Sequence, residues 1–225
     1  MSHFCVYVFH DKDTSIDTLL APYCENLVLE PYLKYTKEEA IAKVRNEIED
    51  YKNGTYAEYL KNPEEYEKNH GRNNGHIEYL KDEFPKKLNW TDEQCYEYMK
   101  SLYASDMIDK DGNILSRYNP KYKRYWYVVG GLWSGGIPMK TNTKLEIKSC
   151  NECKVSQVDM DKIGTPYAYV DTNGNWYSRG EMGWVGVSSN DKDENSWDDE
   201  FKKFIKNQKK STIVTLVDCY LKGII

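Results

Sequence analysis

The chain begins and ends with runs of β-branched and aromatic residues that are typical of strands. Residues 3–9 (HFCVYVF) and 212–221 (TIVTLVDCYL) each suit a strand with at least one buried face. Two shorter runs, 166–171 and 175–178, flank Asn173-Gly174. Since Asn and Gly both accept positive φ, this dipeptide predicts a β-hairpin.

Three segments have the apolar spacing of amphipathic helices. Thr36 with Glu39, and Thr91 with Gln94, form capping boxes that satisfy free backbone N–H groups at two helix starts. A third helix is predicted to begin near Ser196 in an acidic loop. The apolar positions are Ala40, Ile41, Val44, Ile48 and Tyr51 in the first helix, Cys95, Tyr98, Met99 and Leu102 in the second, and Trp197, Phe201, Phe204 and Ile205 in the third.

Residues 55–89 are rich in Tyr, Glu, Lys and Asn, and predict short helices around a polar loop. Residues 144–148 (KLEIK) alternate polar and apolar positions, as a half-exposed strand does. With strands at both ends and helices between them, we predict one α+β domain over residues 1–225. Its single mixed or antiparallel sheet is covered by helices, and a polar helical insertion occupies about 55–115.

Composition restricts the function more than it defines it. The chain has 225 residues and a formal net charge of −5, which argues against general nucleic-acid binding through a basic face. No basic segment precedes an apolar core at the N-terminus, and no apolar run approaches the length of a bilayer span. The six cysteines are too sparse for a disulfide scaffold. We therefore expect a cytoplasmic protein with no membrane contact.

Residues 125–136 (YWYVVGGLWSGG) are the best candidate for a site, because a strand-like run leads into two glycine pairs separated by an aromatic residue. Glycine pairs mark a tight bend, and backbone N–H groups at such a bend can bind an anion. Upstream, Lys121, Lys123 and Arg124 alternate with Tyr122, Tyr125 and Trp126. This pattern suits base stacking with phosphate contacts, but also a strand with an aromatic core face and solvated lysines. The candidate binding residues here are Trp126, Gly130, Gly131, Trp133 and Ser134.

Further candidates lie in or beside later strands. Arg179, Glu181 and Asp218 are charged residues next to apolar runs, so each must face solvent or find a partner. Trp184 follows in a second aromatic and glycine-rich run, and we count Arg179, Glu181 and Trp184 among the binding residues.

Metal binding and acid–base catalysis have weaker signals. Cys150 and Cys153 have the spacing of half a zinc site, but no second half exists, and two incidental cysteines in a surface turn are favoured. No metal and no cofactor are expected. His3, His10 and the loop histidines 70 and 76 are possible acid–base groups, without a recognisable catalytic order.

The sequence resembles an uncharacterised family of phage and prophage proteins. The similar motifs are at 21–26 (APYCEN), 30–32 (EPY), 35–40 (YTKEEA), 118–135 around WYVVGGLWSG, 179–184 (RGEMGW) and 217–220 (VDCY). The family pattern has Asp, Arg and His where this chain has Tyr125, Leu132 and Tyr220. The resemblance implies a phage setting, and the missing titratable groups favour a binding role over catalysis.

Three functional hypotheses follow; the third, a structural or virion-associated protein, is neither supported nor excluded by the sequence. The first is a phage-encoded accessory protein of the host cytoplasm that binds a host or defence protein and inhibits an anti-phage system such as a CRISPR effector. Its expected contact surfaces are the insertion and the bend between Trp126 and Trp133. The alternative is an enzyme or sequestering protein for a nucleotide or nucleic acid. There, Trp126, Trp133 and Trp184 would form a stacking pocket, with Arg179 at the phosphate and Glu181 or Asp218 as general base. Whether the protein is an enzyme is left open.

Overall fold

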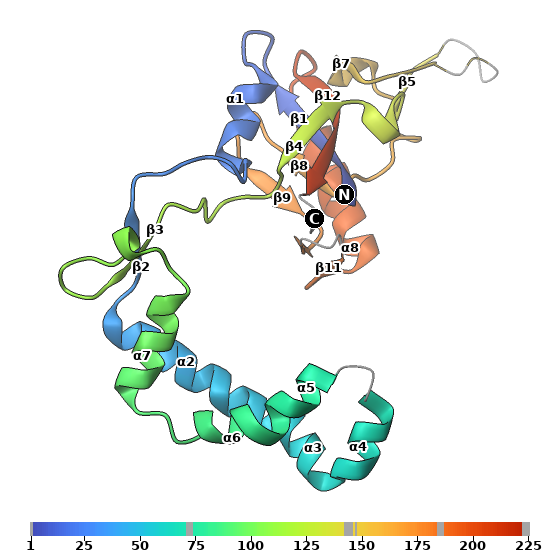
Figure 1. Cartoon of the computed structure of the whole chain (residues 1–225). Coiled ribbons are helices and arrows are strands. Elements are labelled where there is room, and N and C mark those ends of the chain that lie inside the picture. Colours follow the sequence, from blue (N-terminus) through green and yellow to red (C-terminus); the bar gives the residue numbers. More distant parts are fainter. Residues whose placement is uncertain (1, 71–73, 142–145, 147, 184–186, 222–225) are drawn as a thin grey trace. The chain divides into compact units, whose positions relative to one another are not determined.

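The computed structural model describes residues 2–70, 74–141, 146, 148–183 and 187–221 (Figure 1). By its internal contacts the chain divides into two compact units. Met1–Val28 together with Tyr118–Ile225 form one, which we call the sheet unit, and Leu29–Arg117 form the other, the helical unit. The predicted insertion at about 55–115 lies inside the helical unit.

The sheet unit is built on a six-stranded mixed sheet. In spatial order its strands are β4 (Trp126–Val129), β12 (Ile213–Leu221), β1 (Ser2–His10), β8 (Ala168–Val170) and β9 (Trp176–Ser178), and β7 (Glu152–Lys154) also pairs with β12. β1 and β12 are antiparallel along their whole length, whereas β1 and β8 are parallel. The α+β prediction is confirmed, the sheet is mixed, and the two predicted terminal strands lie at its centre.

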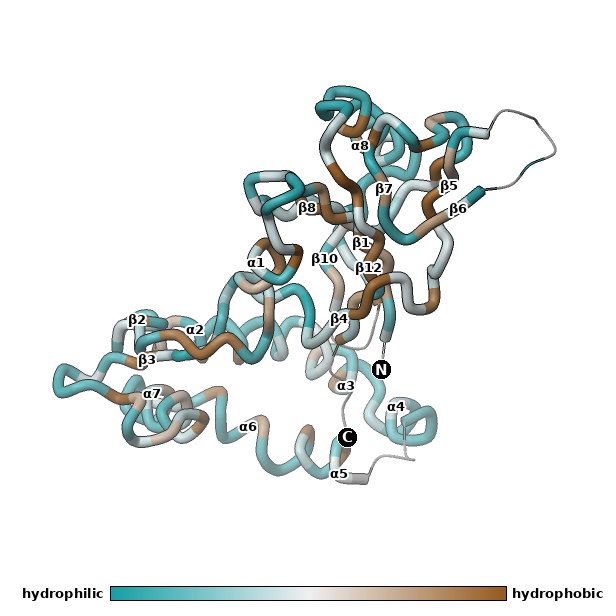
Figure 2. The backbone as a smooth tube through the Cα atoms, turned by 90° about the horizontal axis from the view of Figure 1, so that it is seen from above, coloured by the Kyte–Doolittle hydropathy of each residue, from teal (hydrophilic) through white to brown (hydrophobic). Residues whose placement is uncertain are grey.

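Side chains alternate between the two faces of β1 and β12, as the strand period of two requires. Tyr7, Phe9 and Leu216 belong to the core cluster that includes α8 (Glu194–Lys206). Their sequence neighbours Val6, Val8 and Val217 belong to a second cluster with α1 (Ile16–Leu20). The backbone tube in Figure 2 is accordingly hydrophobic along much of both strands.

Helix α8 confirms the predicted core face but begins differently. Trp197, Phe201 and Ile205 are buried, and fully burying such a side chain contributes about 1.5–3 kcal/mol. The N-cap is Asp193, whose carboxylate accepts from the backbone N–H groups of Asn195 and Ser196. The prediction of a cap near Ser196 is therefore wrong, because the acidic side chain one turn earlier takes the free N–H groups.

The hairpin between β8 and β9 is confirmed, although its turn is built differently. Only Gly174 has positive φ, at 82°, while the Asp171 carboxylate accepts from the backbone N–H groups of Asn173 and Asn175. Among the described residues, three two-stranded ladders lie outside the main sheet. The sheet unit has β5 (Ile137–Met139) with β6 (Lys148–Cys150) and β10 (Glu181–Met182) with β11 (Ser188–Ser189), and the helical unit has β2 (Tyr32–Tyr35) with β3 (Ile114–Ser116). The predicted strand at 144–148 lies mostly outside the described residues.

The helical unit contains both predicted capping boxes. Its helices are α2 (Lys37–Tyr51), α3 (Ala57–Lys61), α4 (Pro63–His70), α5 (Asn74–Glu78), α6 (Phe84–Lys87) and α7 (Asp92–Ser101). Thr36 caps α2 and Thr91 caps α7, each reciprocated by the residue three positions on. In α7 the buried side chains are Cys95, Tyr96 and Met99, whereas Leu102 is exposed. The helix ends at Ser101, so the predicted apolar stripe stops before Leu102.

Candidate functional site

The glycine-rich bend follows edge strand β4 and turns the chain sharply. Gly130 and Gly131 have φ of 76° and 53°, values that side chains other than glycine rarely adopt. A Cβ atom on Gly131 would lie 2.4 Å from the Cβ atom of Asp218, and one on Gly130 would lie 2.5 Å from the Asn151 amide nitrogen. A side chain at either position would collide with Asp218 or Asn151, so close packing requires glycine at both.

The Asp218 side chain is the centre of this packing. It is fully buried, and its carboxylate accepts a hydrogen bond from the backbone N–H of Leu132 at 3.0 Å. The bend thus does bind an anion, as its backbone suggested, but the anion is a carboxylate of the same chain. This explains the glycine pair without an external phosphate.

His3 is the second partner of Asp218. Its Nδ1 lies 3.1 Å from the carboxylate, across the β1–β12 pair. An ionised carboxylate can only accept, so in this contact Nδ1 of His3 is the donor to Asp218. The His3 side chain is 27% exposed, so the pair resembles an oriented general base at a partly open position.

Aromatic side chains cover this pair. The Tyr220 ring lies 4.2 Å from the His3 ring and 5.5 Å from the Trp126 ring, with Trp126 stacked on it at 19°. Burial and the Asp218 charge raise the pKa of Tyr220. Burial, and then the same charge, raise the pKa of Cys5 to about 12, so this thiol is not an activated nucleophile. The arrangement therefore combines a histidine with the stacked rings of Tyr220 and Trp126, and Cys5 adds no reactive thiolate to it.

The remaining predicted residues of the bend are structural. Trp133 is partly buried and packs against the core cluster under α8. The Ser134 hydroxyl and the Gly135 backbone N–H both contact the Asn151 side chain. Trp126 lines the groove beside β4, whereas Trp133 packs against the core cluster under α8, so the described residues place the two tryptophans in different surroundings.

Arg179 and Glu181 face different cavities. The Arg179 guanidinium pairs with Asp191 at 2.6 Å, and Arg179 lines a cavity beside Trp197. Glu181 lines a second cavity, beside Trp176. The Ser188 hydroxyl, followed by the Arg179 guanidinium, holds the pKa of Asp191 below its usual range. Arg179 is therefore already paired, and Trp184 lies outside the described residues.

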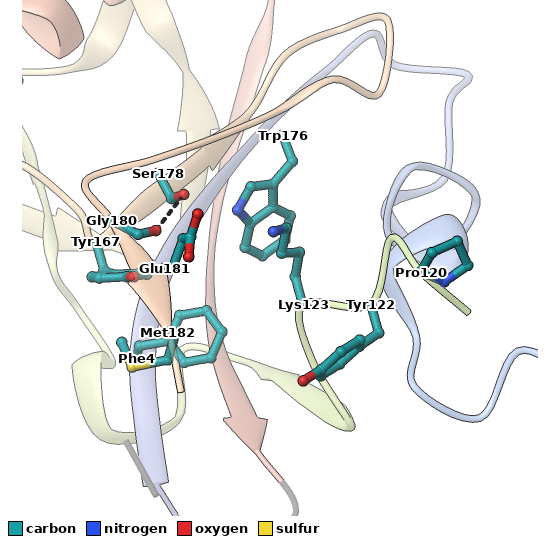
Figure 3. A pocket seen from close by; sticks show the side chains of 10 residues that line it. All are labelled: Phe4, Pro120, Tyr122, Lys123, Tyr167, Trp176, Ser178, Gly180, Glu181 and Met182. Atoms are coloured by element: carbon teal, nitrogen blue, oxygen red, sulfur yellow. Dashed lines mark hydrogen bonds between the residues drawn. The ribbon is translucent and has the colours of Figure 1, made fainter. Parts of the chain in front are cut away.

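The sequence analysis missed a pocket, which we call the Trp176 pocket. Its volume is about 210 Å³, and it is lined by Phe4, Pro120, Tyr122, Lys123, Tyr167, Trp176, Ser178, Gly180, Glu181 and Met182 (Figure 3). The Phe4 ring packs edge-on against Tyr167 at 5.4 Å and against Trp176 at 6.4 Å. The sequence did carry one sign of this pocket, the alternation of aromatic and basic residues that includes Tyr122 and Lys123 in the segment before β4.

The third cation of that segment is used elsewhere. Arg124 is buried, donates from Nη2 to the Leu20 carbonyl at 2.9 Å, and lies over the Tyr127 ring. The interpretation of residues 121–126 as one stacking and phosphate-binding surface is therefore divided by the structure. Tyr122 and Lys123 line the Trp176 pocket, and Arg124 holds the end of α1 in place within the sheet unit.

The cysteine pair does not form a metal centre with other described residues. No three His, Cys, Asp or Glu side chains come together as metal ligands in the described part of the chain. Cys150 ends β6 and Cys153 lies in β7, buried within the core cluster under α8. The prediction of two incidental surface cysteines is wrong for Cys153. Burial, the contact with Cys150 and nearby charges raise its pKa to about 12.

Comparisons with known proteins add no relatives. No protein-family model, no curated protein and no solved structure matches the chain. Among the described helices, none has the length and apolar content needed to cross a lipid bilayer.

Proposed function

We propose that the protein is a phage-encoded accessory protein of the host cytoplasm that binds a bacterial defence protein, such as a CRISPR effector, and inhibits it. The resemblance of the motifs to phage and prophage proteins supports the setting. The observation that carries the binding role is a set of exposed apolar side chains at an open sheet edge. These are Trp126 and Val129, which lie on opposite faces of β4, and Leu132 in the bend; their exposed fractions are 55%, 43% and 72%.

Strand β4 is the terminal strand of the main sheet. β4 pairs with β12 on one side, and no other described strand pairs with its opposite side. A strand edge exposes backbone N–H and C=O groups that an extended segment of another protein can pair with. A shallow groove of about 620 Å³ follows this strand, lined by Asp17, Asn26, Arg124, Tyr125, Trp126, Tyr127, Val128 and Val129.

The proposed occupant is an extended segment of the defence protein that adds to β4 as a further strand. Backbone pairing would supply affinity, and the exposed Trp126 and Leu132 side chains would supply specificity. Large exposed aromatic side chains are frequent among the residues that dominate binding energies. The Asp218 contact holds the bend rigid, which lowers the ordering cost of binding.

The proposal is tested in bacteria that carry a defence system and express the tagged protein. We expect recovery of a defence component with the tagged chain and a rise in phage plating. The double variant Trp126→Ala/Leu132→Ser should reduce the rise in phage plating at least tenfold. Leu33→Ser is the matched control, because Leu33 is 54% exposed and lies outside both expected contact surfaces.

Two outcomes would contradict the proposal. One is the absence of any defence component in the recovered material together with unchanged phage plating. The other is full protection by the double variant, which would show that the edge at β4 and the bend is not the contact surface.

A further inference from the structure

We propose that the Trp176 pocket binds a guanine nucleotide, with the base inside the pocket and the sugar and phosphate at its mouth beside Lys123. This inference does not depend on the proposed inhibition of a defence protein. It rests on the size of the pocket, the arrangement of its aromatic rings and the polar groups at its edge (Figure 3).

The pocket fits a single flat ring system. Its volume of about 210 Å³ is below the range of roughly 300–1,000 Å³ usual for ligand pockets, so it cannot enclose a whole nucleotide. Phe4, Tyr167 and Trp176 line one part of the pocket, and Tyr122 comes from the segment before β4. Aromatic faces of this kind stack the bases of nucleotides.

One polar atom in the wall lacks a partner. The indole Nε1–H of Trp176 is buried and makes no hydrogen bond with any described residue. In Figure 3 it is turned toward Ser178 and Glu181. A buried donor without an acceptor is unfavourable. Because this atom has almost no accessible surface, a carbonyl oxygen on a bound base would satisfy it once the indole turns toward the cavity.

Glu181 supplies the complementary acceptor. One carboxylate oxygen accepts from the Asn190 amide at 3.3 Å, and an ionised carboxylate has capacity for several further hydrogen bonds. Guanine has two N–H groups beside its carbonyl oxygen on one edge. It can therefore donate twice to Glu181 and accept from Trp176. Adenine has only its amino group as a donor on that edge, and no carbonyl oxygen.

The Lys123 charge argues against a second class of ligand, a cation, in this pocket. Aromatic rings with a carboxylate can also hold a methylated ammonium group. Here the exposed Lys123 side chain extends toward Trp176 (Figure 3). A lysine and a free N–H donor both repel a cation and favour a ligand with acceptor atoms and a phosphate.

The pocket is held open by contacts outside it. The buried Asn119 amide donates to the carbonyls of Pro22 and Cys24, which fixes the segment that carries Tyr122 and Lys123. On the other side, the Tyr23 ring lies 5.0 Å from Trp176, and its hydroxyl donates to the Gly174 carbonyl. These contacts order the walls before a ligand arrives, which favours binding.

The test is titration of the purified full chain with GMP, AMP, CMP and guanosine, followed by tryptophan fluorescence and calorimetry. We expect saturable binding of GMP, at least fivefold weaker binding of AMP, and weaker binding of guanosine because it lacks the phosphate. Choline is the probe for the cation alternative and should not bind.

Three variants separate the roles of the polar groups. Trp176→Phe should weaken GMP binding about tenfold, because the ring remains and the N–H is lost. Glu181→Gln should reduce the preference for GMP over AMP. Lys123→Gln should weaken GMP binding and leave guanosine binding unchanged. Trp126→Phe, outside the pocket, is the matched control and should bind as the parent chain does.

The proposal is overturned if none of the four compounds binds saturably at millimolar concentration, or if choline binds better than GMP. GMP binding that none of the three pocket variants weakens would also overturn it. Lys123 and Glu181 are exposed, so their variants keep the test decisive even where Trp176→Phe does not fold. Unchanged phage plating with the parent chain, together with saturable GMP binding, would contradict the defence proposal alone.

Discussion

At the scale of single residues, the glycine-rich bend is explained by the side chains beneath it. Asp218 lies under Gly131, and Asn151 lies under Gly130 and receives the Gly135 N–H. The backbone carbonyl of Asn151 accepts a hydrogen bond from the backbone N–H of Leu216 at 2.7 Å. The bend is thus a structural device that stabilises a buried carboxylate, and the functional candidates are the exposed side chains around it.

Substitution of Gly131 tests this explanation. In Gly131→Ala the new Cβ atom meets the Asp218 side chain near its backbone, and the positive φ disfavours any side chain. We expect a loss of about 3 kcal/mol in the free energy of unfolding, measured by urea denaturation. Gly164→Ala is the control, since a Cβ atom there has no neighbour within 4 Å. Equal stability of the two variants would contradict the packing argument.

The ion pair of Arg179 with Asp191 predicts a pH dependence. The pKa of Asp191 is lower in the folded chain than its ordinary value, so its carboxylate contributes stability in full above the unfolded pKa of about 3.9. This contribution is lost as the pH falls through the folded value. We expect Asp191→Asn to be less stable than the parent chain at pH 7, and the difference to shrink toward about pH 3.

Urea denaturation at several pH values measures this difference. High salt should reduce it at pH 7, because the pair is partly exposed and surface charges are screened. A difference that stays constant from pH 7 to pH 3 would show that the Asp191 carboxylate does not stabilise the fold through its charge.

At the scale of elements, helix α8 shows how a local pattern and a tertiary contact combine. Its apolar face is readable at helical spacing, and the buried Trp197 also donates from Nε1 to the Pro166 carbonyl at 2.8 Å. The Thr165 hydroxyl contacts Asp198 on the first turns of the same helix. These contacts fix α8 against the segment before β8, which no helical periodicity encodes.

The two possible caps of α8 are distinguished by alanine substitution. Asp193→Ala removes the acceptor of two backbone N–H groups and should cost about 1 kcal/mol of stability. Ser196→Ala should change stability by less than about 0.5 kcal/mol, because Ser196 is a donor of its backbone N–H and not the cap. Thermal or urea unfolding of both variants gives the answer, and the reverse order would restore the sequence-based assignment.

At the scale of the whole molecule, each unit has a hydrophobic core of its own. In the sheet unit the clusters lie on the two faces of β1 and β12. In the helical unit Ala40, Val44 and Cys95 belong to one cluster, and the Phe84 ring packs against Tyr51 and Tyr56. Separate cores favour local opening of one unit without loss of the other.

Hydrogen exchange of the variant Phe84→Ala tests this separation. Removal of a fully buried Phe ring should cost about 3–5 kcal/mol, and protection of the amides in α2 should fall accordingly. The amides of β1 should keep their protection. Val6→Ala is the matched variant in the sheet unit and should give the opposite result. Equal loss in both units from either variant would show one cooperative fold.

The sequence by itself determined the features that depend on neighbours in the chain. The capping boxes at Thr36 and Thr91, the terminal strands and the hairpin at Gly174 each follow from a fixed spacing of a few residues, so they could be predicted. The tertiary structure decided which distant segments meet. Asp218 lies under the bend because β12 pairs with β4, and the Trp176 pocket joins Phe4, Lys123 and Glu181 from separate segments. Local patterns carry no information on these pairings, since a strand satisfies its backbone hydrogen bonds equally with many partners.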